Sequence, residues 1–340
     1  MTVTIKDVAH LAKVAPSTVS RVIADSPRIS EKTKLRVREA MAELNYHPNF
    51  NARSLANKST QALGIVMPSS ANDVLQNPFF PEVIRGISTM AHNKEYALYI
   101  TTGQTEEEIF EGVVRMVHGR RVDGIIVLYS RKNDRVLEYL YEQGFPFTVI
   151  GKPLDHADEI MHVDNDNFNA AYEATEYLID AGQSRIAFVG GSSDLTVTTD
   201  RVEGYRAALV KAGLPQKEEY IVHEEFLREG GREAVSELMS LEEPPTSLVV
   251  ADDLMAFGVL SRLDDMGFKV PDDVCVISFN NLMLAELSSP ALTSVDIQIH
   301  ILGYEACKCL IEKIDQPDTP AKRVIVPHHI VKRESCNSRP

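Results

Sequence analysis

Residues Thr4 to Ile23 read TIKDVAHLAKVAPSTVSRVI, which leaves room for two short helices joined by a tight turn at residues 13–15. Thr4 can cap the first helix, because Asp7 stands three residues later, at the capping-box position. Pro16 suits the first position of the second helix, since its missing N–H is not needed there and its φ is already fixed. The segment therefore predicts a helix–turn–helix hairpin.

The hairpin has an apolar side and a polar side. The residues expected to face inward are Val8, Ala9, Leu11 and Ala12 of the first helix and Val19, Val22 and Ile23 of the second. The outer side of the second helix carries the cation Arg21 and the hydroxyl residues Ser17, Thr18 and Ser20. A short polar helix held across another helix can lay its side chains in the major groove of DNA. An ordinary surface hairpin is the alternative that this segment leaves open.

Charge is distributed unevenly along the 340 residues. The net charge is −14, but residues 1–60 hold ten Lys and Arg against five Asp and Glu, so this part is about +5. The remaining chain is therefore about −19. A cationic head on an acidic body confines attraction to phosphate to one end of the chain, and argues against a protein coated in nucleic acid.

A third helix and a linker follow the hairpin. Ser30 can cap a helix that runs to about Leu44 and closes a small three-helix core, before His47-Pro48 ends it. Its apolar stripe is Val37, Ala40, Met41 and Leu44. Residues 49–61 look like a linker with a helical segment of about seven residues, which is too short to be a stable helix alone in water.

From residue 62 onward, apolar runs alternate with helical stretches. Continuous apolar strands separated by helices predict parallel sheets that are covered on both faces. The runs are Leu63–Met67, Ala97–Thr101, Gly124–Leu128, Phe147–Ile150, Ile186–Val189, Ser247–Ala251 and Val274–Ser278.

Several motifs together resemble the LacI/GalR family of bacterial transcriptional repressors, and most of all the maltose-operon repressors of Gram-positive bacteria. The motifs are D-V-A-x-x-A-x-V at 7–14, T-V-S-R-V at 18–22, P-R-I-S at 27–30, L-N-Y-H-P-N at 44–49 and A-R-S-L at 52–55. The resemblance continues through nearly the whole chain. Two positions depart from the family pattern: Lys13 replaces the usual turn glycine, and Ala15 replaces the usual capping serine.

The resemblance implies an α/β fold: a small all-α helix-turn-helix head followed by a periplasmic-binding-protein-like pair of doubly wound parallel-sheet subdomains. It implies a DNA-binding domain at 1–48, a hinge at 49–61, an effector-binding and dimerisation domain at 62–334 and a tail at 335–340. The N-subdomain would hold about 62–162 and 292–322. The C-subdomain would hold about 163–291 and 323–334.

The resemblance also implies which residues meet DNA. Pro16, Ser17 and Arg21 match positions that reach base edges, and Arg21 would favour guanine. Thr4, Thr18 and Ser20 would hold phosphates or helix starts. In the hinge, Leu55 would wedge between base pairs and kink the duplex, with Arg53 as a minor-groove or phosphate contact.

Ligands of open α/β sheets bind beyond the carboxyl ends of the strands, and the candidates fall there. Phe79 and Phe80 follow the first strand, and we expect one to line the cleft and the other to join the core. By resemblance, Arg201 and Phe226 would bind and stack on the effector. Asp252 would point into the cleft while Asp253 caps a helix. The remaining candidates are Asn280, which stands where relatives carry aspartate, and Lys152, for which a solvated surface lysine is the alternative.

Enzyme chemistry finds no support in the sequence. There is no Walker loop, no G-x-G-x-x-G, no G-x-S-x-G elbow and no zinc-ligand spacing, and Asp164-Asn165-Asp166 lacks the later residues of a calcium loop. We therefore expect neither catalysis, nor a metal, nor a cofactor. The four cysteines are expected to be reduced thiols. The sequence opens with no leader and holds no apolar run of membrane-spanning length, so we expect a cytoplasmic protein with no membrane partner.

These observations favour a homodimeric repressor on a palindromic operator, released by a sugar effector, with maltose or maltodextrin implied by the resemblance. A dimer is favoured over a tetramer because the tail is too short for a further assembly region. One alternative is a regulator that needs a corepressor, either a small molecule or a phosphocarrier protein. Another is a transport sugar-binding protein, which the basic head disfavours.

Overall fold

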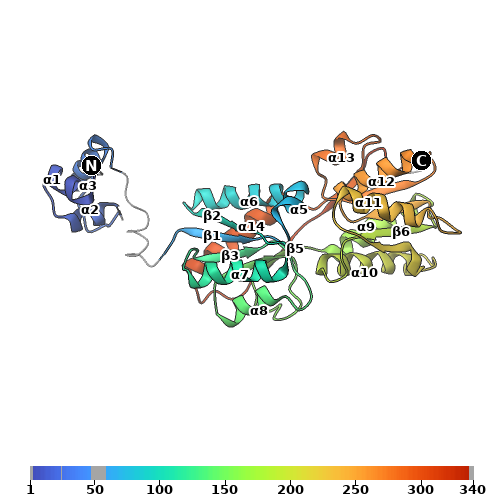
Figure 1. Cartoon of the computed structure of the whole chain (residues 1–340), viewed down its shortest axis with the longest axis horizontal. Coiled ribbons are helices and arrows are strands. Elements are labelled where there is room, and N and C mark those ends of the chain that lie inside the picture. Colours follow the sequence, from blue (N-terminus) through green and yellow to red (C-terminus); the bar gives the residue numbers. More distant parts are fainter. Residues whose placement is uncertain (1–2, 24, 47–58, 337–340) are drawn as a thin grey trace. The chain divides into compact units, whose positions relative to one another are not determined.

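The structure is a computed structural model that describes residues 3–23, 25–46 and 59–336 (Figure 1). The chain divides into two compact units, Met1–Thr60 and Gln61–Pro340. The predicted hinge helix, with Arg53 and Leu55, lies outside the described residues.

The first unit is the predicted three-helix head. Its helices are α1 (Ile5–Leu11), α2 (Pro16–Ile23) and α3 (Glu31–Glu43). The Asp7 carboxylate accepts hydrogen bonds from the Thr4 backbone N–H at 2.8 Å and from the Thr4 hydroxyl at 2.7 Å, which fixes the start of α1. Pro16 opens α2 as predicted, and Ser30 stands at the N-cap position of α3, but its hydroxyl contacts the Thr33 hydroxyl and makes no capping bond to the backbone.

The turn between α1 and α2 forms despite its two departures from the family pattern. Lys13 has a φ of +52°, the left-handed conformation that glycine adopts at no cost. The Thr18 and Val19 N–H groups donate to the Ala15 carbonyl, so the first turn of α2 forms without a serine cap. One expectation was wrong: Leu11 is 38% exposed, because the stripe that meets α2 and α3 is Val8, Ala9 and Ala12, and Leu11 lies beside it.

The N-lobe of the second unit is a six-stranded parallel sheet with the order β11-β5-β4-β3-β1-β2. Alternate residues of β3 face opposite layers: Ile126 packs in the cluster with α6 and α14, while Ile125 and Val127 pack with α7 and α8 (Figure 1). The strands are β1 (Ala62–Val66), β2 (Ala97–Thr101), β3 (Gly124–Val127), β4 (Phe147–Ile150), β5 (His162–Asn165) and β11 (Arg323–Val326). The helices are α5 (Ala71–Gln76), α6 (Phe79–Asn93), α7 (Glu106–His118), α8 (Arg135–Glu142) and α14 (Ile299–Asp315).

The C-lobe repeats this plan with the order β12-β10-β9-β8-β6-β7, in which β12 alone is antiparallel to its neighbour. Its strands are β6 (Ile186–Gly190), β7 (Ile221–His223), β8 (Ser247–Val250), β9 (Cys275–Phe279), β10 (Thr293–Asp296) and β12 (His329–Val331). Its helices are α9 (Asn167–Asp180), α10 (Thr196–Lys211), the 3-10 turn η1 (Glu218–Tyr220), α11 (Arg228–Leu238), α12 (Asp253–Asp265) and α13 (Met283–Leu287). The predicted fold class is confirmed.

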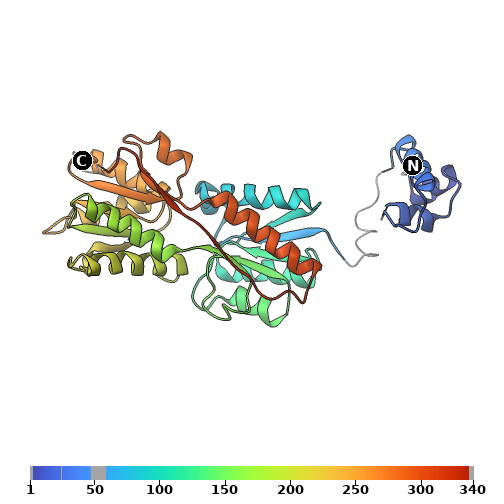
Figure 2. The same cartoon turned by 180° about the vertical axis from the view of Figure 1, so that it is seen from behind.

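The chain passes between the lobes three times, and Figure 2 shows the last passage as a dark-red segment running from one lobe to the other. The predicted subdomain boundaries each misplace one strand. β5 continues to Asn165 in the N-lobe sheet, β10 pairs with β9 in the C-lobe, and β11 pairs with β5 in the N-lobe. The reason is that the chain leaves a lobe only after a strand has ended, at Asn165, Asp296 and Val326. The predicted boundaries instead placed each passage before that strand.

Two glycines allow helices of each lobe to approach closely. A Cβ on Gly86 of α6 would lie 2.1 Å from the His300 carbonyl oxygen of α14. A Cβ on Gly204 of α10 would lie 2.1 Å from the Phe168 carbonyl oxygen of α9. These close contacts pack α6 against α14 in the N-lobe and α10 against α9 in the C-lobe.

The predicted tail is partly structural. Ser335 and Cys336 are buried, and the Ser335 hydroxyl donates to the Val276 carbonyl of β9 at 2.6 Å. All four cysteines are buried, and within the described residues they are thiols and not disulfides. Within the described residues, no helix is long and apolar enough to cross a bilayer.

Candidate DNA-reading helix and ligand cleft

The second helix of the head presents a polar surface. The side chains of Pro16, Ser17, Ser20 and Arg21 are exposed, as is Thr4 at the start of α1. Thr18 is half-buried against the core, which suits a role at the helix start better than one at a base edge. Val19 and Val22 of α2 are buried in the three-helix cluster, so the polar side is held outward by packing.

A cavity with a volume of about 750 Å³ lies between the two lobes of the second unit. Residues that follow β1, β3 and β4 in the N-lobe and β6, β7, β8 and β9 in the C-lobe line it, which is the carboxyl edge of both sheets. Six of the seven predicted effector residues line this cavity: Phe79, Phe80, Arg201, Phe226, Asp252 and Asn280.

Lys152 is the predicted residue that does not line the cavity, although its neighbour Gly151 does. Its side chain is half-buried, and its carbonyl accepts a hydrogen bond from the Ser130 hydroxyl at 2.8 Å. The backbone of Lys152 therefore supports the cavity wall, because Ser130 is itself a lining residue.

Three phenylalanines and Tyr129 are the phenylalanine and tyrosine residues that line the cavity. Phe79 and Phe80 open α6 and meet edge to face, with ring centroids 5.2 Å apart. Both are half-buried and both line the cavity, so the expectation that one would join the core was wrong. Phe226 comes from the opposite lobe and lies against Gly191, where a Cβ would approach within 2.2 Å of the Phe226 ring.

Arg201 reaches the cavity from α10 and is only 4% exposed. Its Nε donates to the Asn167 side-chain oxygen at 3.0 Å, and its Nη1 donates to the Ala251 carbonyl at 2.7 Å. Within the described residues, its Nη2 makes no hydrogen bond. Burial lowers the pKa of Arg201 to about 10, so the side chain remains a cation and can donate to a ligand oxygen.

Of the two adjacent aspartates after β8, Asp252 caps the helix, a role that was predicted for Asp253. Asp252 is the helix cap: its Oδ1 accepts from the N–H groups of Leu254 at 2.7 Å and Met255 at 3.2 Å. It still lines the cavity, because its Oδ2 faces Asn77 and Asn280.

Asp253 instead turns into the C-lobe core and is fully buried. Its Oδ1 accepts from the hydroxyls of Ser278 at 2.5 Å and Ser294 at 2.8 Å. Its Oδ2 accepts from the Leu282 N–H at 2.7 Å. The prediction failed because the first of two carboxylates after the strand has the extended backbone that a cap needs, with φ −156° and ψ 142°.

Asn280 lies at the end of β9 with a φ of +104°, a conformation rare for a side chain other than glycine. Its N–H donates to the Val295 carbonyl at 2.8 Å, and its side-chain NH₂ donates to Asp252 Oδ2 at 2.8 Å. The side-chain oxygen makes no hydrogen bond within the described residues, so the amide can accept from a hydroxyl in the cavity.

Three further lining residues were missed by sequence reasoning. Asn77 is buried between α5 and α6, and Asn167 links Arg201 to Asp164, whose Oδ1 accepts from the Asn167 amide at 2.9 Å. Burial raises the pKa of Asp164 to about 7. Asn77 stands directly before Pro78 and Phe79, and its nearness to Phe79 and Phe80 was the one signal available.

The cavity suits a polyhydroxylated ligand. Aromatic rings come from both lobes, Arg201 offers donors, and Asp252 and Asn280 offer acceptors, which together match the apolar faces and hydroxyls of a sugar.

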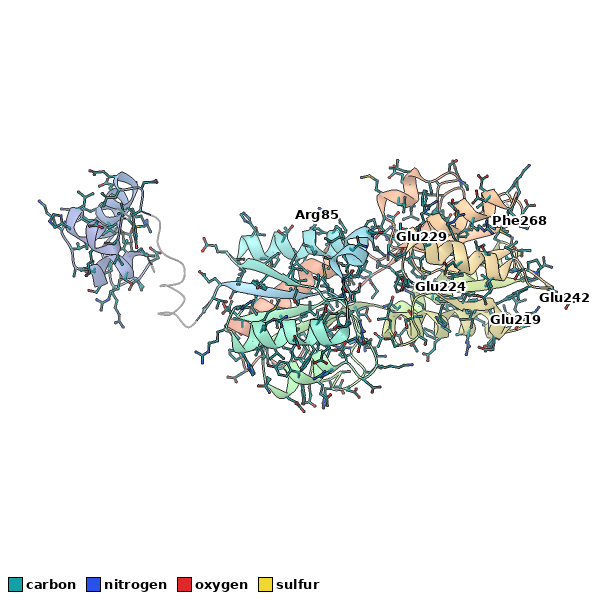
Figure 3. All side chains as sticks on the ribbon, in the orientation of Figure 1. Arg85, Glu219, Glu224, Glu229, Glu242 and Phe268 are labelled. Atoms are coloured by element: carbon teal, nitrogen blue, oxygen red, sulfur yellow. The ribbon has the colours of Figure 1, made fainter. Side chains whose placement is uncertain are left out.

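The charged residues lining the cavity are five acids and two arginines: Asp164, Asp194, Glu224, Glu225, Asp252, Arg131 and Arg201. Glu224, labelled in Figure 3, has a pKa raised by burial and by neighbouring glutamates. This lining disfavours an anion. Within the described residues, no group of acids, histidines or cysteines could hold a metal ion.

Comparison with known proteins agrees with both parts of the chain. Residues 4–49 match the family of bacterial regulatory proteins, lacI family, and residues 175–336 match a periplasmic binding protein-like domain. The HTH-type transcriptional regulator MalR of Streptococcus pneumoniae serotype 4 is 41% identical over 337 residues, covering 98% of this chain and all of that protein.

Two solved structures extend the agreement. A LacI transcriptional regulator from Bacillus cereus subsp. cytotoxis NVH 391-98 is 56% identical with a TM-score of 0.81, covering 82% of this chain and 99% of that one. The complex of the transcriptional regulator CelR with cellobiose is 30% identical with a TM-score of 0.77, covering 98% and 99%. These relatives are transcriptional regulators and not enzymes. With its helix-turn-helix head and its two-lobed body, the chain belongs to the lacI family of bacterial regulatory proteins and is a transcriptional regulator.

Proposed function

We propose that this regulator represses an operon for the use of maltose or maltodextrin, by binding a palindromic operator as a homodimer in the cytoplasm and leaving it when the sugar fills the cleft. The observation that carries the proposal is the cavity of about 750 Å³, with aromatic walls from both lobes and the polar set Arg201, Asp252 and Asn280. The likeness to MalR and the cellobiose in the CelR complex support a disaccharide.

The head supplies the DNA-binding part of the proposal. Arg21 reads a guanine edge, Pro16 and Ser17 contact neighbouring base edges, and Thr4, Thr18 and Ser20 secure phosphates and helix starts. Arg53 and Leu55 of the hinge contact the minor groove, where Leu55 kinks the duplex. Two copies of the head related by a two-fold axis match two half-sites of a palindrome.

The effector acts by preferring one arrangement of the lobes. A sugar can release the protein from DNA only if it binds more tightly to the form that binds DNA poorly. Residues of both lobes line the cavity, so a bound sugar contacts both and favours one angle between them. That angle determines how the two hinge segments of a dimer are spaced on the duplex.

Titration of a protein–operator complex tests the proposal. Fluorescence anisotropy of a labelled palindromic duplex should fall as maltose is added, and should not change with glycerol at the same concentration. Tightening of the complex would instead indicate a corepressor. A requirement for a phosphocarrier protein would appear as tight operator binding only when that protein is added. No preference for any palindromic duplex over random DNA, with or without sugars, would contradict the proposal altogether.

A thermal-shift screen over mono- and disaccharides identifies the sugar independently of DNA. A ligand that binds only the folded state raises its melting temperature in proportion to RT ln(1 + [L]/Kd). The expected result is a rise with disaccharides that exceeds the rise with glucose, because both aromatic walls then contact a ring.

A further inference from the structure

Asn77 connects the two lobes through its side-chain amide. It lies in the N-lobe between α5 and α6, and it is only 3% exposed. Its side-chain oxygen accepts from the Phe79 N–H at 2.9 Å. Its NH₂ donates to two C-lobe acceptors, the Phe226 carbonyl at 3.1 Å and Asp252 Oδ2 at 3.2 Å. The amide therefore has partners in both lobes, and all of them belong to lining residues.

At another part of the cleft, main-chain N–H and carbonyl groups form hydrogen bonds between the lobes. There the Thr196 N–H donates to the Ser130 carbonyl at 3.1 Å, and the Lys132 N–H donates to the Asp194 carbonyl at 2.9 Å. Main-chain groups form both of these bonds, and the Thr196 hydroxyl adds a longer one to the Ser130 carbonyl at 3.3 Å. The link at Asn77 depends on a side chain, since the amide is what joins Phe226 and Asp252 to the N-lobe.

We infer that Asn77 is a positioning residue for the effector: from the N-lobe it holds the Asp252 carboxylate and the Phe226 main chain in the orientation that binds sugar. Asp252 Oδ1 is already committed to the start of α12, so Oδ2 is the oxygen whose surroundings can vary. Its two donors are Asn280 of the C-lobe and Asn77 of the N-lobe. The second donor is lost whenever the lobes separate, so the polar set is complete only in the closed form. This inference rests on the proposed function, because it assigns a role at the same site.

Chemical changes at residue 77 have distinct expected effects. Alanine leaves the Phe226 carbonyl and Asp252 Oδ2 with one donor fewer in a buried site. Aspartate places a second carboxylate beside Asp252, and two ionised carboxylates at this distance repel each other unless they share a proton. The charged neighbours of Asp252 are Arg201 and Asp253, and neither is altered by the substitution. In acid the shared proton should restore the bond between residue 77 and Asp252 in an Asn77→Asp protein, whereas in alkali this link should be lost.

The experiment uses the full-length chain with Asn77→Asp, Asn77→Ala and the control Asn72→Asp, which makes the same charge change at an exposed position of α5. Maltose affinity is measured by calorimetry at pH 5.5 and pH 8. Hydrogen exchange of peptides covering 224–230 and 252–256 is followed at the same pH values, corrected for intrinsic rates. Circular dichroism confirms that each variant is folded.

The expected result is a loss of at least tenfold in maltose affinity for Asn77→Asp at pH 8, with faster exchange in both peptides. Both effects should be largely reversed at pH 5.5, while Asn72→Asp matches the wild type throughout. Asn77→Ala should lose affinity equally at both pH values. If Asn77→Asp misfolds, Asn77→Ala provides the test through the same two measurements.

Wild-type affinity and exchange in Asn77→Asp at pH 8, or a loss that acid does not reverse, would overturn the inference. For Asn77→Ala, wild-type affinity and exchange would do the same. If the wild type binds no maltose, the proposed function fails instead. The exchange measurements then still decide the role of Asn77, because they need no ligand.

Discussion

The guanidinium carbon of Arg201 lies 4.1 Å from the centroid of the Phe279 ring, so the cation is stacked on an aromatic face inside the C-lobe. The ring covers one face of the guanidinium, and the bonds to Asn167 and Ala251 fix its plane. This leaves Nη2 as the guanidinium nitrogen that makes no hydrogen bond to another described residue, while Arg201 lines the cavity. A buried arginine that is held in this way is pre-organised for a ligand, because little side-chain freedom remains to be lost on binding.

The first prediction follows from this arrangement. Arg201→Ala and Arg201→Lys should both bind the operator but ignore maltose, since neither retains a fork whose plane is fixed by Phe279, Asn167 and Ala251. Loss of the bonds to Asn167 and Ala251 should also lower the free energy of unfolding by about 1–3 kcal/mol for the alanine variant. Operator anisotropy with and without maltose checks the first point, and urea unfolding checks the second.

The matched control is Arg206→Ala, which removes an arginine of the same helix that pairs with Glu218 at the protein surface. It should respond to maltose like the wild type. Retained induction in Arg201→Ala would falsify the ligand role of Arg201.

A second prediction concerns the contact between Gly191 and Phe226. Gly191→Ala places a methyl group 2.2 Å from the original position of the Phe226 ring, so the ring must move. Such overpacking costs about 1–3 kcal/mol in stability, and the displaced ring should reduce maltose affinity by about tenfold. Calorimetry and thermal unfolding measure the two effects.

Two further variants separate the causes. Ser184→Ala alters an exposed residue before β6 that does not line the cavity, and should leave both quantities unchanged. The double variant Gly191→Ala with Phe226→Leu should recover stability, because leucine can avoid the methyl group, but not affinity, because the aromatic face is gone. Full affinity in Gly191→Ala would show that Phe226 does not contact the sugar.

Most of the strands could be predicted because a parallel strand buried on both faces is a continuous apolar run. β3, with the sequence GIIV, and β8, with SLVV, are of this kind. β5 reads HVDN and was not predicted, although all four of its residues are buried. Asn165 of β5 is satisfied by distant carbonyls, those of Ile297 and Val326, and no local pattern reports such partners.

The site was predictable in its residue types more than in its geometry. Phe226 and Arg201 were found through the family resemblance, but the helix cap was assigned to Asp253 and is Asp252. Which of two adjacent carboxylates caps a helix depends on one backbone conformation, and the sequence does not specify it. Asn77 was missed because its partners Phe226 and Asp252 lie 149 and 175 residues away along the chain.

A third prediction concerns pH. Burial raises the pKa of Asp164 from its ordinary 3.8 to about 7, so between these values the folded protein binds a proton that the unfolded chain has released. Stability therefore falls as pH rises through this window, and the loss is complete above the folded-state pKa. The free energy of unfolding should drop by on the order of 1–3 kcal/mol across it. Urea unfolding at a series of pH values measures this slope.

Asp164→Asn provides the comparison, because an amide cannot ionise. The slope should become shallower but not vanish, since burial also raises the pKa of Asp253 to about 7. Asp166→Asn, which changes the half-buried cap of α9 two residues away, should retain the wild-type slope. An unchanged slope in Asp164→Asn would show that another group titrates.

The last prediction concerns the head. Arg21 is the one cation on α2, and its side chain is exposed, so it is free to make a bidentate contact with guanine O6 and N7. Arg21→Ala should lose about 1–3 kcal/mol at a single base pair of each half-site and should accept substitutions there. Arg36→Ala makes the same change of charge at an exposed position of α3, outside α2. It should preserve sequence preference. Competition binding with single-base operator variants distinguishes these outcomes. A different result would be an equal loss of affinity for every duplex, with a salt dependence reduced by about one phosphate contact. It would mean that Arg21 contacts the DNA backbone and that Ser17 or Pro16 must select the base.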